Sequence, residues 1–294
     1  MSEFTAEAPP ARQRGPLWFA WRRFLGNKAA VVGGAVLLVL VLMAVFAPLI
    51  TPYPPEGQLF LTEALAFPSA SHWFGVDNLG RDFYSRIVYG ARVSLSIGFI
   101  AAGFSVLIGI PLGALAGYFG GKVDWIIMRI IELFSVVPPL LGALLLGSLT
   151  RGGYGMIVFI AALFGWVQVC LLVRAQVKSF REKEFVRAAQ ALGASPAYII
   201  RRHLIPNSIS PIIVGFVLAI PLAMMLEASL SFLGVGVPPP TPTWGQMINE
   251  GIDYMFFYWH LAVFPTAALA ISVLATSLFG DGLRDALDPT LKGR

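Results

Sequence analysis

The chain has little charge and almost no cysteine. Charged residues make up 13% of its 294 residues, whereas hydrophobic residues make up 57% and the mean hydropathy is +0.75. A soluble domain carries about 25% charged residues, so this composition excludes an ordinary soluble protein and indicates an integral membrane protein. The single cysteine, Cys170, lies in the apolar run GWVQVCLLV. That excludes an intrachain disulfide and predicts a small buried side chain.

The motifs of several enzyme classes are also missing. There is no HExxH and no GxSxG, the sequence patterns of zinc and serine hydrolases. The nearest candidate for a P-loop, AGYFGGKV at 116–123, begins with Ala and ends with Val where Ser or Thr must bind Mg²⁺. His72, His203 and His260 are far apart and fall on different sides of a membrane, which argues against a metal site. We therefore expect no catalytic residues, no metal and no cofactor bound by this chain.

Long apolar runs are abundant. A helix needs about 20 apolar residues to cross the hydrocarbon of a bilayer, so we predict an all-α membrane protein with six transmembrane helices. The predicted spans are Ala29–Ile50, Val93 to about Gly117, about Ile130 to Leu149, Gly155–Val173, Ile209 to about Val237, and Leu261–Phe279. Prolines in or near these spans could act as hinges, but we expect kinks without motion, because neighbouring helices satisfy the freed carbonyl groups. These prolines are Pro139, Pro211, Pro221 and Pro265.

Lys and Arg give the orientation. With the amino terminus inside, four of the 21 basic residues fall outside (Arg81, Arg86, Arg92 and Arg151), which leaves 21 − 4 = 17 inside. Cytoplasmic flanks carry the excess of Lys and Arg, so both termini are predicted to be cytoplasmic. Topology thus explains the formal charge of +5, and we expect no nucleic-acid partner.

Four regions follow from this topology. Residues 1–28 form a cytoplasmic tail, expected to be disordered up to Gly15, with an interfacial helix around Trp18–Phe24. Residues 29–90 contain the first span and a long external loop. Residues 91–281 contain the other five spans and a cytoplasmic loop at 174–207, and residues 282–294 form a cytoplasmic tail.

The segment Glu184–Asn207, EFVRAAQALGASPAYIIRRHLIPN, is a basic, helix-forming island in an apolar chain. Glu184 to Leu192 favours helix, and Gly193 stands where a left-handed residue ends one. Ser195 followed by Pro196 is typical of a helix start. We predict a second helix to about Leu204, after which Pro206 turns the chain into the fifth span.

Two roles for this segment are equally compatible with its residues. Arg187 with Ala188 and Ala189 combines a charge with small side chains that let a partner approach closely. An interfacial amphipathic helix on anionic lipid would have a similar composition. The residues alone leave both open.

The segment resembles the signature loop of permease subunits of ABC importers, written EAA, three residues, Gly, nine residues, Ile, one residue, Leu-Pro. Ala188, Ala189, Gly193 and Pro206 fall in register, whereas Arg187, His203 and Ile205 stand where the signature has Glu, Ile and Leu. The form RRHLIPN is similar to the peptide branch of the family. Arg187 reverses the charge of the signature residue, so an electrostatic contact does not carry over; Glu182 or Glu184 could replace it.

The resemblance covers nearly the whole chain. HWFGVDNLGRDFYSRIVYGARVSLSIG at 72–98, EASLSFLGVG at 227–236, PPPTPTWG at 238–245 and FGDGLRDALDPTLK at 279–292 are similar to dipeptide, oligopeptide and nickel permeases, in the subunit conventionally called C. Ser277 departs from the Asn common there.

This resemblance implies a type I, MetI-like permease of the bacterial inner membrane that imports di- or oligopeptides. Its implied partners are a second homologous permease, two cytoplasmic ATPases that bind ATP and Mg²⁺, and an external binding protein. It also implies that the 184–207 loop couples to an ATPase, with Glu184, Arg187, Ala188, Ala189, Gly193, Ser195 and Pro206 as the coupling residues. A nickel chelate or another small solute is the alternative substrate.

Two carboxylates fall within predicted spans, Glu132 in the third and Glu227 in the fifth. Such residues are costly in a bilayer and are candidates for a translocation path or gate, together with Ser231. They also allow a proton-coupled carrier as an alternative function. The simpler interpretation pairs Glu132 with Arg129 and lets Glu227 bind nearby hydroxyl groups such as those of Ser229 or Ser231.

The outer loops hold the remaining polar residues. Asp77, Arg81, Asp82 and Arg86 are closely spaced and of mixed sign, which predicts an ion-pair network that packs the loop. The alternative is that Asp77, Arg81, Asp82 and Trp244 dock the binding protein. Trp244 and the aromatic residues at 254–259 are expected at the outer membrane interface.

Overall fold

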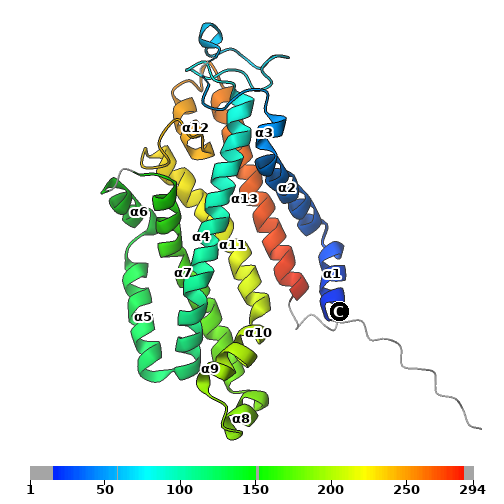
Figure 1. Ribbon diagram of the computed structural model, residues 1–294, viewed down its shortest axis with the longest axis vertical. Helices are drawn as coiled ribbons and strands as arrows, with labels where there is room; N and C mark the ends of the chain where they lie inside the picture. The colour runs from blue at the N-terminus through cyan, green and yellow to red at the C-terminus, as the bar shows by residue number, and fades with distance from the viewer. Residues whose placement is uncertain (1–15, 58, 150–151, 288–294) are drawn as a thin grey trace, which may run out of the picture.

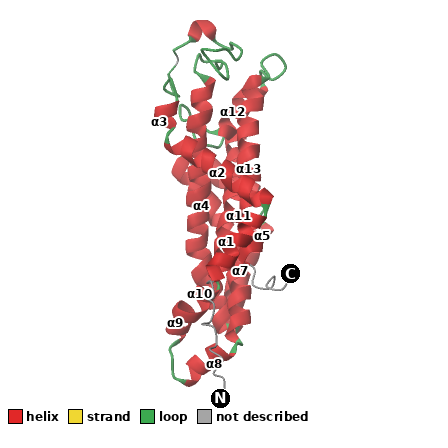
Figure 2. Cartoon of the chain, turned by 90° about the vertical axis from the view of Figure 1, so that its right-hand side faces the viewer, coloured by secondary structure: helices red, strands yellow, loops and turns green. Residues whose placement is uncertain are grey.

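The computed structural model describes residues 16–57, 59–149 and 152–287. The predicted disordered segment at 1–15, and residues 288–294 of the predicted C-terminal tail, lie outside the described residues. The described chain is an elongated bundle of helices running roughly along one axis (Figures 1 and 2). Its elements are α1 Pro16–Gly26, α2 Lys28–Val45, α3 Ala47–Ile50, η1 Leu61–Glu63, α4 Phe83–Phe119, α5 Gly121–Val136, α6 Pro139–Ser148, α7 Tyr154–Arg181, α8 Glu184–Ala191, α9 Pro196–Ile199, η2 Ile200–Leu204, α10 Ile205–Asn207, α11 Ile209–Phe232, α12 Trp244–Ile252 and α13 His260–Leu287.

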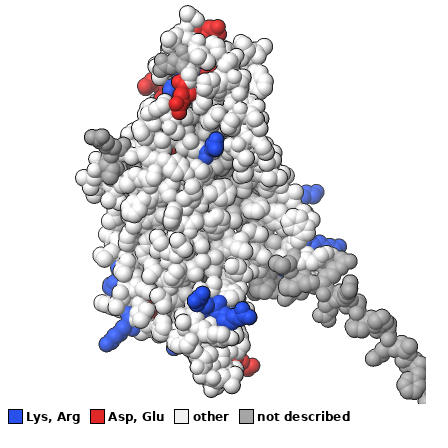
Figure 3. Space-filling model, in the orientation of Figure 1, with Lys and Arg blue, Asp and Glu red and all other residues white. Residues whose placement is uncertain are grey.

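Five described helices are long and apolar enough to cross a membrane, namely α2, α4, α7, α11 and α13. Figure 3 shows a broad uncharged band around the middle of the molecule, with Lys and Arg gathered toward the end that carries α8. The first predicted span, Ala29–Ile50, corresponds to α2 and the short α3 that follows it. Helix α1 packs beside the end of α13 through a Phe24–Phe279 ring contact with centroids 5.5 Å apart.

The pair α4 and α7 forms the spine of the bundle. Gly109, Gly113 and Gly117, one turn apart on α4, face α7. A Cβ atom on Gly113 would lie 2.5 Å from the carbonyl oxygen of Cys170, and one on Gly117 would lie 2.7 Å from that of Arg174. Only a hydrogen fits at these places, so the glycines let the two backbones touch, which is how small residues favour helix association in membranes.

The third predicted span is not one continuous helix. Instead of one helix at about 130–149, α5 and α6 form a pair bent by 79°. Helix α5 begins at Gly121, directly after Gly120, and both glycines have positive φ. The break falls at Val137 and Pro138, whose ψ angles are 118° and 126°. Pro139 therefore starts a new helix rather than kinking an old one, because its ring is compatible with the first turn of a helix and not with its interior. Counting the bent pair as one span gives up to six.

The second span begins ten residues earlier than predicted. Helix α4 starts at Phe83, with the Asp82 side chain accepting a hydrogen bond from the backbone N–H of Ser85 at 2.8 Å. Arg86 and Arg92 thus lie within α4 and not in a loop. The external loop after α3 ends at Asp82.

Candidate coupling loop and outer cap

The segment after α7 contains the predicted helix stop at Gly193 and helix start at Ser195; we call this bend between α8 and α9, with the two helices, the elbow. Gly193 has φ +79°, and the backbone N–H groups of Gly193 and Ala194 donate to the carbonyls of Gln190 and Ala189, each at 3.0 Å. This pair of bonds is a Schellman motif, which ends α8. The hydroxyl of Ser195 then accepts from the N–H of Tyr198 at 3.3 Å and starts α9. The helix stop and helix start are both confirmed.

Beyond the elbow, one detail of the prediction is wrong. Pro206 lies within α10, helical conformation continues from α9 through η2 to α10, and only the turn residue Ser208 separates α10 from α11. The turn just before Pro206 is a π-helix, Ile200–Leu204. Such a wider turn changes the hydrogen-bond register next to a residue that has no N–H to donate. The elbow therefore connects directly to the fifth span.

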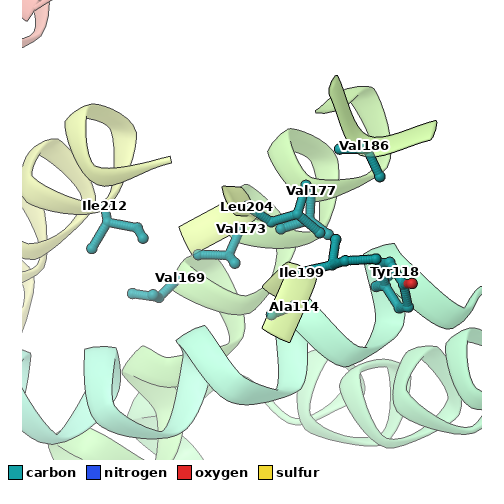
Figure 4. Packing of buried hydrophobic residues seen from close by; sticks show 9 residues of the cluster. All are labelled: Ala114, Tyr118, Val169, Val173, Val177, Val186, Ile199, Leu204 and Ile212. Atoms are coloured by element: carbon teal, nitrogen blue, oxygen red, sulfur yellow. The ribbon is translucent and has the colours of Figure 1, made fainter. Parts of the chain in front are cut away.

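The underside of the elbow is packed against the membrane helices (Figure 4). Val186 of α8, Ile199 of α9 and Leu204 of η2 are fully buried. They share one apolar cluster with Val173 and Val177 of α7, and with Ala114 and Tyr118 of α4. Burial of each such side chain contributes about 1.5–3 kcal/mol. The loop is therefore fixed to the α4–α7 spine.

The opposite side of the elbow is open. Glu184, Arg187 and Ala188 are exposed and Ala189 is half-buried, and no ion pair joins Arg187 to another described residue. Leu192 is 89% exposed. Sequence reasoning missed Leu192 as part of this surface, although its position four residues after Ala188 places both on one helix face.

At the outer end, the predicted ion-pair network is present and almost completely buried. Arg81 Nε and Arg86 Nη1 each lie 2.6 Å from Asp77 Oδ2. Glu250 of α12 joins them, 2.9 Å from Arg86 Nη1 and 3.2 Å from Arg81 Nη2. Sequence reasoning missed Glu250, because it lies 164 residues from Arg86. The network ties α12 and the external loop to the start of α4.

Asp82 does not belong to this network. It caps α4 and accepts from the Ser85 hydroxyl at 2.7 Å, and its other oxygen lies 2.8 Å from His72 Nδ1. The burial of His72 and Asp82 makes this a second point at which the loop is held to α4.

Glu227 also serves as a structural link. Its side chain is 0% exposed and accepts hydrogen bonds from Ser231 at 2.8 Å and from Ser94 of α4 at 3.2 Å. The backbone N–H of Trp244 donates to the same Ser94 hydroxyl. Glu227 thus joins α11 to α4 and to the start of α12. The predicted bond to a nearby serine hydroxyl is the one that forms.

Trp244 is buried, so its predicted place at the membrane interface is wrong. The indole Nε1 donates to the carbonyl of Ile87 at 3.1 Å, and the side chain is fully enclosed. Phe256, Phe257 and Trp259, from the same predicted group, are exposed.

Glu132 pairs with Arg129 at 2.6 Å, as the simpler interpretation predicts. Both side chains are about half exposed, at 47% and 55%.

Comparison with known proteins gives consistent matches over this architecture. Residues 109–293 match the family described as binding-protein-dependent transport system inner membrane component, and residues 15–68 match the N-terminal transmembrane domain of oligopeptide transport permease C. The chain belongs to this family of inner membrane transport components.

Several relatives of this permease are similar over most of their length. It is 43% identical to the dipeptide transport system permease protein DppC of Bacillus subtilis (strain 168), over 93% of this chain and 85% of that protein. It is 40% identical to the oligopeptide transport system permease protein OppC of the same organism, over 93% and 89%. It is also 40% identical to the glutathione transport system permease protein GsiD of Pectobacterium atrosepticum, over 92% and 90%. It is therefore a DppC- and OppC-like permease subunit of an ABC importer.

Its fold agrees with a solved relative. A permease chain of the MetNI methionine ABC transporter, in an inward-facing conformation, superposes with a TM-score of 0.54 at 18% identity, covering 69% of this chain and 96% of that one. The permease thus has the type I ABC importer fold. Members of its family are transport subunits and not enzymes. They work with ATPases and a substrate-binding protein.

The four residues predicted to dock the binding protein are buried. Asp77, Arg81, Asp82 and Trp244, the predicted docking residues, are each at most 3% exposed. Buried side chains cannot contact a receptor directly, so these residues are better explained as the framework beneath the outer surface. Likewise, Glu227 faces α4 within the chain, where it accepts a hydrogen bond from Ser94.

Proposed function

We propose that this permease imports small peptides, as one half of a permease pair that works with two cytoplasmic ATPases and an external binding protein. The match to dipeptide, oligopeptide and glutathione permeases over nine-tenths of the chain supports this substrate class. In this proposal the second permease is a different, homologous chain. ATP and Mg²⁺ bind to the ATPases.

The loop at 184–207 is the proposed mechanical joint to an ATPase. The observation that carries this proposal is the contrast between its two sides. One side is fixed by fully buried Val186, Ile199 and Leu204, and the other presents Leu192 and Ala188 to solvent. An exposed apolar helix end on a rigid support is what a docking helix needs. An apolar residue left in water is a cost that a partner removes.

Arg187 gives this joint a charge of its own. It lies on the exposed side without a described ionic partner, so we propose that it meets a carboxylate on the ATPase. Glu184, in the first turn of α8, is placed to interact favourably with the helix dipole. The exposed side of α8 therefore carries a negative charge in its first turn, from Glu184, and a positive charge after it, from Arg187.

A proton-coupled carrier receives no support from the two carboxylates. Glu132 is paired with Arg129 at the surface, and Glu227 is enclosed by hydroxyl donors.

Reconstitution of the complete complex in proteoliposomes tests the proposal. Peptide with its binding protein should stimulate ATP hydrolysis, and Leu192→Asp should reduce this stimulation by about tenfold, the factor that corresponds to 1.4 kcal/mol of lost docking energy. Leu149→Asp is the matched control, since Leu149 is 75% exposed at the other end of the molecule. Equal stimulation in the two variants would contradict the docking role. Absence of any stimulation by peptides in the wild type would contradict the substrate class.

A further inference from the structure

The bend between α5 and α6 lies deep within the membrane part of the permease. In Figure 1 the two helices meet at the edge of the bundle, beside α7. The ring of Phe134, in the last turn of α5, contacts those of Phe164 and Trp166 of α7, with centroids 6.2 and 5.6 Å apart. Phe164 stands midway along the uncharged run 155–173 of α7. Because a run of this length crosses the hydrocarbon, the bend lies near the middle of the bilayer.

Two backbone carbonyl groups at this bend lack a hydrogen-bond donor. In an α-helix the carbonyl of one residue accepts from the N–H four residues later. For Phe134 and Ser135 those later residues are Pro138 and Pro139, which have no N–H. Within the described residues no other backbone or side-chain group donates to either oxygen. The donors that neighbouring helices were expected to supply are therefore not found here.

The bend is also open in the single chain. Every residue at 135–141 is exposed, and Val136 is 79% exposed. A backbone acceptor that faces hydrocarbon without a donor costs several kcal/mol, so irregular backbone at this depth occurs only where protein buries it or where it lines a water-filled cavity. Lipid is thus excluded as the neighbour of the open bend.

A second permease is a poor source of the missing donors. A transmembrane helix uses its backbone N–H groups within itself, so a helix packed over the bend would leave both carbonyls unsatisfied unless it brought polar side chains. Water satisfies the carbonyls, and so does a solute that carries its own N–H groups. The bend is therefore suited to the side of an aqueous path.

We propose that the carbonyl oxygens of Phe134 and Ser135 line the translocation path and accept hydrogen bonds from N–H groups of the peptide in transit. These donors are the backbone amides and the α-ammonium group, which peptides carry whatever their side chains. The C-terminal end of a helix also attracts positive charge, which favours the ammonium group. The inference rests on the proposed import of peptides and adds to it a place where the peptide backbone is recognised.

The water-filled path is tested by labelling of introduced cysteines in the assembled permease–ATPase complex. The probe is 2-aminoethyl methanethiosulfonate, and the native Cys170 is buried. A cysteine at the bend, from Val137→Cys, should react about tenfold faster than one from Val39→Cys, because the reactive thiolate forms in water and not in hydrocarbon. Val39 is the matched control, 62% exposed in the middle of the uninterrupted α2. Val136→Cys repeats the measurement at a neighbouring exposed residue.

The hydrogen bonds are tested by protection from this labelling. Trialanine should slow the reaction at 137, and an analogue with ester oxygens in place of its amide N–H groups should need an about tenfold higher concentration for the same protection, because hydrogen bonds to the carbonyls are lost. The binding protein is left out, so that its own selection between the two ligands does not enter.

Three results overturn the inference: equal rates at 137 and 39, no protection by trialanine, and equal protection by the two ligands. Any of them in a complex whose ATP hydrolysis responds to peptide and binding protein leaves the proposed function standing. A complex without that response overturns both.

Discussion

At the scale of single residues, Gly193 is required for its backbone conformation and not for its size. A Cβ atom there would meet nothing within 4 Å, but the φ of +79° is one that other residues adopt at a cost. We predict that Gly193→Ala lowers the coupling of peptide transport to ATP hydrolysis and destabilises the elbow by about 1–2 kcal/mol. The ratio of transported peptide to hydrolysed ATP measures this.

Gly103 provides the matched control for that prediction. It also has open space around it, but it lies inside α4 with ordinary helical φ. Gly103→Ala should therefore be neutral or slightly stabilising, since Gly in a helix costs about 0.5–1 kcal/mol relative to Ala. Identical coupling in the two variants would contradict the role assigned to Gly193.

The ion pairs of Arg86 and Arg129 differ in burial, so removing them should lower the free energy of unfolding by different amounts. Arg86 is fully buried and contacts both Asp77 and Glu250. Arg86→Met leaves buried carboxylates with one partner fewer, and we expect a loss of about 3–5 kcal/mol. Arg129→Met removes an exposed pair with Glu132 and should cost at most about 1 kcal/mol. Thermal denaturation of the purified complex compares the two variants. Equal midpoints would show that the outer ion-pair network does not hold α12 and the external loop to α4.

At the scale of helices, the link between α5 and α7 is a bidentate ion pair. Arg174 of α7 binds Asp124 in the first turn of α5 through Nε at 2.5 Å and Nη2 at 2.6 Å. Ile127 and Ile131 of α5 also pack in one apolar cluster with Trp166 of α7. The ion pair adds a fixed point at the start of α5, so its loss should loosen the first turns of this helix. We predict that Asp124→Asn increases amide hydrogen exchange in 121–127 by roughly fivefold, equivalent to about 1 kcal/mol.

Lys122→Gln serves as the control for that measurement, because Lys122 precedes Asp124 by two residues, is exposed and makes no ion pair with a described residue. If it increases exchange as much as Asp124→Asn, then a general change of charge, and not the bidentate pair, explains the effect.

Sequence patterns predicted elements well where one local cause decides them. Gly193 and Ser195 each fix the backbone by themselves, so the elbow was predictable. The break between α5 and α6 also has a local cause, Pro138 and Pro139, but it was missed because the span was assigned from hydropathy, which counts apolar residues and contains no information on direction. The early start of α4 was hidden for another reason. From the sequence, the charge of Arg86 suggests a loop residue. Its place inside a helix is explained only by its ion pair with Glu250, which is far away in the chain.

The same distinction applies to the candidate sites. The surface proposed for coupling is continuous in sequence, so its residues could be named without the structure, apart from Leu192. The outer cap is assembled from α4, α11 and α12. Burial of Trp244 and Asp77 depends on that assembly, so their sequence context suggested a surface role that the structure does not give them.

At the scale of the whole molecule, the permease has a fixed framework with the ion-pair network at one end and the elbow at the other. The glycine stripe on α4 closes it onto α7, the outer end is held by buried ion pairs, and the cytoplasmic end presents the elbow. A displacement of the elbow by an ATPase would pass directly into α7 and α11, because the chain is helical on both sides of it.

The most direct test of the account is protection of the elbow by the ATPases. Cys170, the only cysteine, is buried, so a cysteine introduced by Ala188→Cys can be labelled selectively with a membrane-permeant maleimide. We predict that adding the ATPase subunits to the permease pair slows labelling at 188 by about tenfold or more, while a cysteine from Phe256→Cys, at a site 89% exposed on the outer side, reacts at the same rate with and without them. Unchanged labelling at 188 in an assembled, ATP-hydrolysing complex would contradict the claim that this loop is the joint to the ATPase.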